Sequence, residues 1–380
     1  MKKKICFIVA TPLTAKAFLL NHFEMLSKEY EISLVANFEN EDTSSLKNLS
    51  LKSVHSINIQ RSINIFQDFN TLFLLYKYLK KMNFDAIQTV TPKAGLLGML
   101  AGKMAGTNNR IHIFTGQVWH TKTGVFKRVL MFIDKIIVKA ATQILVDGKS
   151  QQQYLIANKI ITGKNSSVLG KGSISGVDIN RFIPDTTMRV KMRGQLNLLE
   201  TDVVFMFLGR FNTDKGLLDL AEGFKKLRSE NKNVKLLLVG FDEENLEPKI
   251  REIVNNKESL IFTGPTPKPQ DCLQAADVFC LPSYREGFGT SVIEASLMKL
   301  PIICSDTYGL METIIENKTG LRHKVANIES IYDQMVILAN DKNKRTLFGE
   351  NGANYVKEYF SAETISREWV LFYNKIFSKK

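Results

Sequence analysis

Short apolar runs alternate with amphipathic segments along nearly the whole chain. In the first half, runs typical of buried strands cover residues 5–10, 32–36, 86–90, 111–114 and 143–146. Helical periodicity lies between them, over residues 17–27, 69–81, 96–104 and 126–139. The second half repeats this alternation, with strands predicted over 203–208, 234–239, 260–262, 278–281 and 302–304, and helices over 218–229, 246–255, 290–298 and 328–339. Such alternation is typical of parallel sheets with helices on both faces, so we predict an α/β chain of two doubly wound domains.

The stretch between the two halves, residues 182–200, is polar and contains Pro184 and Asp185, and we interpret it as a linker. We predict an N-terminal domain, a C-terminal domain and a terminal helical segment, which cover residues 1–182, 183–358 and 359–380. Doubly wound sheets bind ligands at the carboxyl ends of their strands. Two such domains that face each other would form a cleft, which is the expected place for a small-molecule ligand.

The chain has a formal net charge of +13, and its first half holds nearly all of the excess. Residues 1–185 contain 24 lysines and arginines against 12 acidic residues. A basic half attracts nucleic acid, an anionic membrane or an anionic substrate, and charge alone does not choose among them. The four cysteines form no C-x-x-C pair, and no apolar run reaches the roughly 20 residues that a membrane span needs. We therefore expect a reduced, cytoplasmic protein.

A loop of small residues follows the predicted strand 278–281 and leads into a helix. Gly287 and Gly289 let the backbone approach a ligand closely. Thr290 and Ser291 lie at the helix start, where free N–H groups and the helix dipole favour a phosphate. A capped helix start without a ligand is the structural alternative. Neither a G-x-G-x-x-G turn nor a P-loop occurs in the chain, which argues against a dinucleotide-dependent oxidoreductase and a P-loop nucleotidase.

Three charged residues near these strand ends fit a nucleotide. Glu294 lies about one turn inside the helix, where its carboxylate suits two vicinal hydroxyls, as on a ribose. Arg210 and Lys215 follow the predicted strand 203–208, and their side chains offer a planar fork and a point charge to phosphate oxygens. Taken alone, they could equally be surface cations on a loop. With the glycine loop at another strand end, they predict a diphosphate site.

Here the chain resembles a known family, the group 1 retaining glycosyltransferases of the GT-B fold. The resemblance is carried by Gly209-Arg210 with Lys215-Gly216, and by Glu286-Gly287-Phe288-Gly289 with Glu294, which reproduces the E-x7-E spacing of that family. Further matches follow in order along the chain: Gly176-Val177-Asp178, Arg181-Phe182, Val239-Gly240, Thr263-Gly264 and Leu281-Pro282-Ser283. Several spaced motifs in the same order are far more specific than any one of them. The resemblance implies two Rossmann-like domains that face a cleft, with the donor in the C-terminal one.

The resemblance also implies roles for these residues. Arg210 and Lys215 would hold the donor diphosphate and stabilise its charge as it leaves. Glu286 would face the donor sugar and act in catalysis. The residues expected to bind the donor are Gly264, Gly287, Phe288, Gly289, Thr290, Ser291 and Glu294. No Asp-x-Asp motif occurs, in agreement with an enzyme that needs no metal, and we expect no other cofactor.

In the first half, Lys93 follows the predicted strand 86–90, and Thr115 and Gly116 follow the strand 111–114. We expect these residues on the acceptor side of the cleft. Many family members have a histidine where Thr115 stands, and here His120 comes five residues later. His120 is therefore either an active-site residue or a surface histidine. His112 lies within a predicted strand and is expected in the core.

The predicted helix 126–139 is basic and apolar, with Phe126, Leu130, Ile133 and Ile137 on one helical face. This face either packs on the sheet or lies on an anionic membrane. Membrane contact at the inner face would suit an acceptor sugar linked to a lipid diphosphate. Residues 91–119 resemble bacterial enzymes that build surface polysaccharide.

The predicted function is transfer of a hexosyl or N-acetylhexosaminyl group, with retention, from a nucleotide-sugar to a saccharide or lipid-linked acceptor. UDP is the expected nucleotide. A sugar-nucleotide epimerase of the same fold is the alternative enzyme. A nucleotide-sugar-binding protein without turnover is a further alternative. A nucleic-acid-binding protein would fit the net charge of +13, but no nucleic-acid motif occurs, and we predict no such partner.

Overall fold

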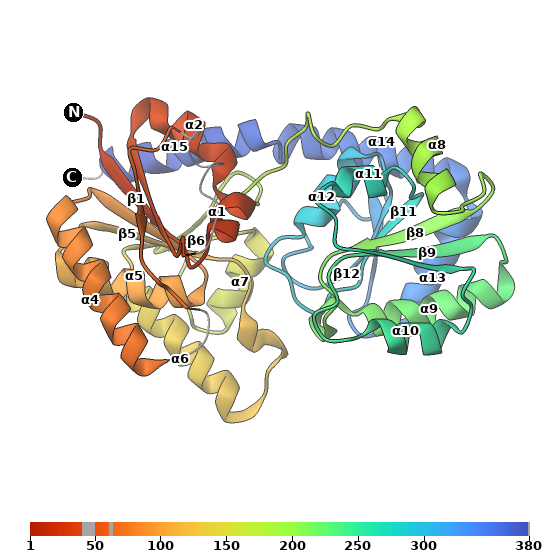
Figure 1. Cartoon of the computed structure of the whole chain (residues 1–380), viewed down its shortest axis with the longest axis horizontal. Coiled ribbons are helices and arrows are strands. Elements are labelled where there is room, and N and C mark those ends of the chain that lie inside the picture. The colour runs from red at the N-terminus through yellow and green to blue at the C-terminus, as the bar shows by residue number, and fades with distance from the viewer. Residues whose placement is uncertain (40–49, 61–63, 379–380) are drawn as a thin grey trace. The chain divides into compact units, whose positions relative to one another are not determined.

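The computed structural model describes residues 1–39, 50–60 and 64–378. It divides into two compact units, the first formed by Met1–Gly176 with Ala362–Lys380 and the second by Val177–Ser361 (Figure 1). Each unit has its own parallel sheet and its own hydrophobic core. The predicted fold class, two Rossmann-like α/β domains, is confirmed. The chain crosses between the units a few residues from the boundaries expected at 182/183 and 358/359.

The first unit has a seven-stranded parallel sheet in the order β3-β2-β1-β4-β5-β6-β7. Its strands are β1 Lys4–Ile8, β2 Glu31–Ala36, β3 Ser53–Ser56, β4 Ala86–Val90, β5 Asn109–Phe114, β6 Gln143–Val146 and β7 Ser166–Val168. The strands β1, β2, β4, β5 and β6 agree with the sequence prediction to within a few residues. The two edge strands were not predicted, because they are short and their serines interrupt any apolar run.

Helices cover both faces of this sheet. They are α1 Pro12–Phe18, α2 Leu20–Glu29, α4 Ile65–Met82, α5 Pro92–Ala105, the 3-10 helix η1 Val118–Thr121, α6 Gly124–Ala140, α7 Lys149–Ala157 and α15 Ala362–Ser378. The helices α4, α5 and α6 lie on one face, and α2 and α15 on the other (Figure 1). The C-terminal helix α15 is thus part of the first unit, where the buried rings of Trp369 and Tyr373 pack against Phe7.

On α6, the predicted apolar face packs inward. Ile137 is buried, and Leu130 and Ile133 are partly buried against the core. The packing alternative therefore holds for this face, apart from Phe126, which stays 55% exposed.

The second unit has a six-stranded parallel sheet in the order β10-β9-β8-β11-β12-β13. Its strands are β8 Val203–Leu208, β9 Val234–Val239, β10 Leu260–Gly264, β11 Val278–Leu281, β12 Ile302–Ser305 and β13 Gly320–His323. Its helices are α8 Thr186–Gln195, η2 Thr213–Lys215, α9 Leu217–Glu230, α10 Glu247–Val254, α11 Pro269–Leu273, α12 Thr290–Leu297, α13 Ile328–Asn340 and α14 Lys342–Tyr359. The edge strand β13 and the helices α8, α11 and α14 were not predicted.

The linker prediction for residues 182–200 is wrong, because this stretch contains the helix α8. The Asp185 side chain accepts hydrogen bonds from two main-chain N–H groups and caps the helix start. Arg193 is 2% exposed and donates to the Asp277 carboxylate and to the carbonyl oxygens of Ala275 and Asp202. The helix is fastened by buried arginine contacts more than by an apolar stripe, so its composition resembles that of a loop.

The first crossing between the units requires a glycine. Gly176 has φ +59°, and a Cβ atom there would lie 2.8 Å from the Cα atom of Ala362. Just beyond, the Val177 N–H donates to the Phe360 carbonyl oxygen at 2.9 Å. The two chain crossings therefore run side by side.

Candidate active site

The residues expected at the donor site come from loops at the carboxyl ends of neighbouring strands. Arg210 and Lys215 follow β8, and the segment from Glu286 to Glu294 follows β11, the next strand in the sheet. The structure brings the two loops into contact, because the Lys215 Nζ atom lies 2.5 Å from Glu286 Oε1. Ser283, whose role was not predicted, donates its hydroxyl to the same oxygen at 2.7 Å. Both members of the ion pair are partly buried, so this cation is held in one place.

The two loops are also fastened to each other beside this ion pair. The Arg285 guanidinium donates to Asp214 Oδ2 from Nε at 3.0 Å and from Nη2 at 2.8 Å. The main-chain N–H of Tyr284 donates to the Asp214 carbonyl oxygen. Gly216, with φ +68°, lies so close to the Pro282 carbonyl that no side chain fits there. These contacts position Lys215 from both sides.

Arg210 is held by an acid that the sequence analysis did not single out. Its Nη1 atom lies 2.9 Å from both carboxylate oxygens of Glu243, which follows β9, and Asn212 donates to the same carboxylate at 2.8 Å. The Arg210 side chain is 59% exposed. Within the described residues, its Nε and Nη2 atoms have no acceptor. The guanidinium is thus oriented on one side and open to an anion on the other.

The glycine loop is supported from β12. Gly309 has φ +80°, and a Cβ atom there would lie 2.6 Å from the carbonyl oxygen of Glu286 and 2.7 Å from that of Gly287. The Phe288 side chain points into the core, with its ring 5.2 Å from that of Phe360. Phe288 therefore anchors the loop, and only its main chain is available to a ligand. Gly289 donates its N–H to Gly309.

The helix α12 begins at the end of this loop. The Thr290 N–H donates to the Phe288 carbonyl oxygen at 2.7 Å. The Ser291 N–H has no acceptor among the described residues, and both side chains are partly exposed. A free N–H group at a helix start is a ready donor to a phosphate oxygen.

Glu294 carries the most informative carboxylate of the site. The side chain is partly buried, and within the described part of the chain its carboxylate makes no hydrogen bond or ion pair. Burial raises its pKa to about 7, and the charge of the nearby Arg181 limits the rise. An acid that is partly buried without a partner is unfavourable for folding, and acids with a raised pKa are often found at ligand sites.

Gly264 lies at the end of β10, on the same edge of the sheet but two strands away from β8. Its φ is +69°, its carbonyl oxygen accepts from the Gly240 N–H at 3.0 Å, and open space surrounds the position of a Cβ atom. Among the described residues, Gly264 makes no hydrogen bond with the charged residues of the site.

In the first unit, the residues expected on the acceptor side follow the neighbouring strands β4 and β5. Lys93 forms an ion pair with Asp68 at 2.7 Å. Thr115 is partly exposed, and Gly116 has φ +97°. His120 lies on η1, and its Nδ1 atom is 2.7 Å from the Tyr154 hydroxyl.

His112 is fully buried, as predicted for a core histidine. Its Nδ1 atom lies 2.8 Å from the Thr89 hydroxyl, and burial lowers its pKa to about 3, so the ring is neutral.

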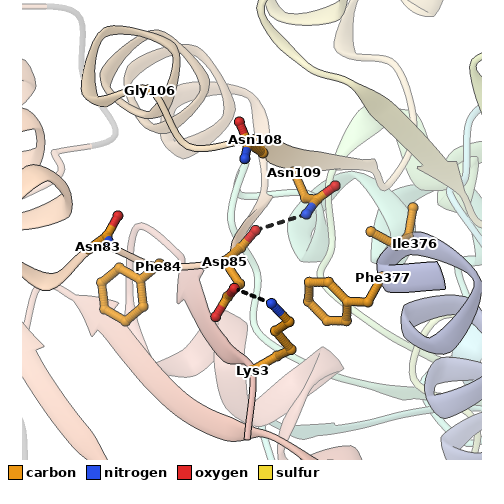
Figure 2. A pocket seen from close by; sticks show the side chains of 9 residues that line it. All are labelled: Lys3, Asn83, Phe84, Asp85, Gly106, Asn108, Asn109, Ile376 and Phe377. Carbon is orange, nitrogen blue, oxygen red and sulfur yellow. Dashed lines mark hydrogen bonds and ion pairs between the residues drawn. The ribbon is translucent and has the colours of Figure 1, made fainter. Parts of the chain in front are cut away.

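A hollow of about 280 Å³ lies at the opposite edge of the first unit's sheet, at the amino ends of β1, β4 and β5 (Figure 2). Lys3 pairs there with Asp85 at 2.9 Å, and the Asn109 amide donates to the Asp85 carbonyl oxygen. None of the expected site residues lines it. Among the described residues, no cluster of histidine, cysteine or acidic side chains could hold a metal ion, and no helix is long and apolar enough to cross a membrane.

Comparison with known proteins agrees with this arrangement. Residues 188–355, most of the second unit, match the family described as Glycosyl transferases group 1. The second unit is therefore similar to the group 1 glycosyltransferases.

The similarity extends to the first unit. The chain is 27% identical to the capsular polysaccharide biosynthesis glycosyltransferase CapM of Staphylococcus aureus, over 98% of each chain. It is also 27% identical to UDP-Gal:alpha-D-GlcNAc-diphosphoundecaprenol alpha-1,3-galactosyltransferase of Escherichia coli, over 90% of this chain and 89% of that one. These matches identify the chain as a glycosyltransferase that resembles enzymes of bacterial surface polysaccharide synthesis.

The fold agrees with solved structures. The Anabaena protein HepE, solved in complex with UDP and glucose, superposes with a TM-score of 0.80 over 98% of this chain and 99% of that one, at 16% identity.

Proposed function

We propose that the enzyme transfers a hexosyl or N-acetylhexosaminyl group from a UDP-sugar to a saccharide or lipid-diphosphate-linked sugar, with retention at the anomeric carbon. The bond between the anomeric carbon and the diphosphate oxygen breaks, and a bond to an acceptor hydroxyl oxygen forms on the same face of the sugar. The hydroxyl proton leaves with the diphosphate or to solvent. UDP remains as the product.

The observation that carries this proposal is the unpaired carboxylate of Glu294, one helical turn from the free N–H of Ser291. Two ribose hydroxyls would donate to the carboxylate and satisfy a group that the protein leaves without a partner. The Ser291 N–H would then meet a phosphate oxygen at the helix start.

The cations act on the leaving group. Lys215, fixed by Glu286 and the neighbouring loop, and the open side of Arg210 would both face negative charge that grows on the diphosphate. Cations held in advance stabilise such charge without reorganising, and this accelerates bond cleavage. Glu286 positions Lys215 and lies beside the donor sugar. The other expected donor contacts come from the main chain of the glycine loop and from Thr290.

The choice of UDP and of a lipid-linked acceptor is supported by the relatives. The similar enzyme of Escherichia coli is named for a UDP-sugar donor and a diphosphoundecaprenol acceptor, and the similar Anabaena structure contains UDP. We place the reaction in the cytoplasm at the inner face of the membrane, with the first unit on the acceptor side. Lys93, Thr115, Gly116 and His120 are the residues that we propose there.

The test is transfer of labelled sugar from a panel of UDP- and GDP-sugars to a short-chain polyprenyl-diphosphate sugar, with the product's anomeric configuration read by NMR. We expect one UDP-sugar to be consumed, with retention and without added metal. An epimerised nucleotide-sugar formed in the absence of acceptor would favour the epimerase. Consumption of no nucleotide-sugar would reject the assignment.

A further inference from the structure

An apolar surface of the first unit is left without a partner. It is formed by the outward sides of two helices that flank α5 on one face of the sheet, with Phe66, Phe69 and Phe73 on α4 and Val125, Val129 and Phe132 on α6. Phe66 is 88% exposed, Phe69 70% and Phe132 63%. We call these six residues the α4–α6 surface. Figure 1 shows α4, α5 and α6 side by side on this face.

Aromatic exposure is concentrated on this surface. Of the exposed phenylalanines in the described part of the chain, only Phe241 lies outside α4 and α6. Single exposed apolar residues need no explanation, but a group of them on two helices of the same sheet face marks an interaction site. This surface is distinct from the inward face of α6 that fills the core.

The charge around the surface has one sign. The helices α4, α5 and α6 carry nine lysines and arginines against two aspartates. Both aspartates are engaged, because Asp68 pairs with Lys93 and the buried Asp134 accepts from the Trp119 indole N–H at 2.7 Å. The positive charge of these helices therefore exceeds their acidic charge, and Lys80 and Lys135 are exposed to an anionic partner. A second copy of the same surface would bring like charges together, which opposes self-association.

The six apolar residues lie towards one end of their helices, and six of the nine lysines and arginines of α4, α5 and α6 lie towards the other. Each helix begins near the edge of the sheet where the parallel strands end and runs back towards the opposite edge. The helix α4 leads into β4, and α5 directly follows β4. The six apolar residues occupy the first halves of α4 and α6, near the edge that carries Lys93 and Thr115. Lysines such as Lys80 and Lys135 lie towards the other end.

We propose that the α4–α6 surface docks the enzyme on an anionic lipid bilayer. The phenylalanines and valines would enter the boundary between headgroups and acyl chains, and the lysines would meet lipid phosphates. This orientation brings the carboxyl edge of the first unit to the depth at which a lipid-linked diphosphate lies. The inference deepens the proposed function and rests on its lipid-linked acceptor.

The test is cosedimentation of the full chain with vesicles of phosphatidylglycerol and phosphatidylcholine at low salt, with pure phosphatidylcholine as the reference. Two combined variants address the surface, Phe66→Ser with Phe69→Ser and Phe132→Ser, and Lys80→Glu with Lys135→Glu. All five side chains are exposed, so their replacement spares the core. Phe241→Ser and Lys225→Glu, at exposed positions of the second unit, are the matched controls.

We expect wild type and both controls to bind the anionic vesicles, and each surface variant to bind roughly tenfold or more weakly. Added salt should release the protein. No binding of wild type to anionic vesicles, or equal binding by the surface variants, would overturn the proposal. A wild-type dimer in sedimentation velocity that is lost in the phenylalanine variant would also overturn the proposal. The same holds if both surface variants lose binding to an oligonucleotide but still bind vesicles.

Transfer to a water-soluble short-chain acceptor separates this proposal from the proposed function. The surface variants should keep wild-type rates with that acceptor and lose them only with acceptor embedded in vesicles. Absence of transfer by wild type with either acceptor would refute the proposed function and leave the vesicle result to stand by itself.

Discussion

Glu294 holds a partly buried carboxylate without a hydrogen-bond partner among the described residues, and its raised pKa has a consequence for stability. Its pKa is about 7 in the folded protein, against an ordinary value of 4.5. The folded state therefore binds the proton more tightly than the unfolded state, so stability falls as the pH rises from about 4.5 through 7. A site built for a ligand can retain such a cost, because the ligand supplies the missing hydrogen bonds.

Glu294→Gln should consequently stabilise the free enzyme at pH 8, because the amide cannot ionise. We expect a rise in Tm of about 2–4 °C, equivalent to about 1 kcal/mol, and no rise at pH 4. Thermal unfolding followed at both pH values is the measurement. The exposed Glu258→Gln serves as the control. A lower Tm for the Glu294 variant at pH 8 would mean that the carboxylate has a structural partner.

Lys215 should matter for the chemical step more than for the fold. Lys215→Met removes a positioned cation, and loss of one such group lowers kcat by roughly 100-fold to 1,000-fold. Steady-state transfer kinetics are the measurement, with the exposed Lys225→Met on α9 as the control. A kcat within a few-fold of wild type would show that the cation does not act on the leaving group.

The site residues fall into two groups by how they could be found. Lys215, Glu286 and Glu294 stand in motifs whose spacing indicates a resemblance, so the sequence alone proposes them as site residues. Glu243 and Asp214 act through partners from other loops, and only the order of strands β9, β8 and β11 brings them together. No local pattern carries that information.

At the scale of elements, buried strands were predicted well, because both of their faces are covered and their apolar runs are continuous. The edge strands β3, β7 and β13 were missed, since each has only three or four residues and polar positions. The helix α8 was missed for another reason. Its stability comes from Arg189 and Arg193, which are both paired with Asp277. Because the sequence of α8 is polar, its composition is also typical of a linker.

Arg193→Ala should destabilise the second unit by about 3 kcal/mol, because it leaves buried carbonyl groups unpaired and removes one cation from Asp277. Chemical denaturation is the measurement. Lys191→Ala on the exposed side of α8 should stay within about 0.5 kcal/mol of wild type. Equal stability of the two variants would show that the buried Arg193 contacts do not stabilise the second unit.

At the scale of the whole molecule, the C-terminal helix completes the first unit. Trp369 is fully buried and donates its indole N–H to the Ile174 carbonyl oxygen at 3.0 Å. The chain therefore begins and ends in the same unit, and the second unit is an insertion between Gly176 and Ala362.

Trp369→Ala should destabilise the first unit by about 3–5 kcal/mol through the cavity it leaves, while the second unit keeps its donor site. Calorimetry with and without UDP is the measurement, with Leu371→Ala, at an exposed position of the same helix, as the control. For the tryptophan variant, we expect the unfolding transition of the first unit to move to a lower temperature. The transition of the second unit should still respond to UDP as in wild type. Loss of the UDP response, or no change in stability, would contradict this division.

In the proposed function, the second unit binds a nucleoside diphosphate through Glu294 and the cations after β8. Calorimetric titration of UDP and GDP, without metal, into wild type and Glu294→Gln tests it most directly. We predict that wild type binds UDP and that the variant binds it about tenfold or more weakly, as expected for lost hydrogen bonds to a charged group. Binding of neither nucleotide by wild type, or equal UDP affinity in the variant, would mean that Glu294 does not hold the nucleotide of the donor.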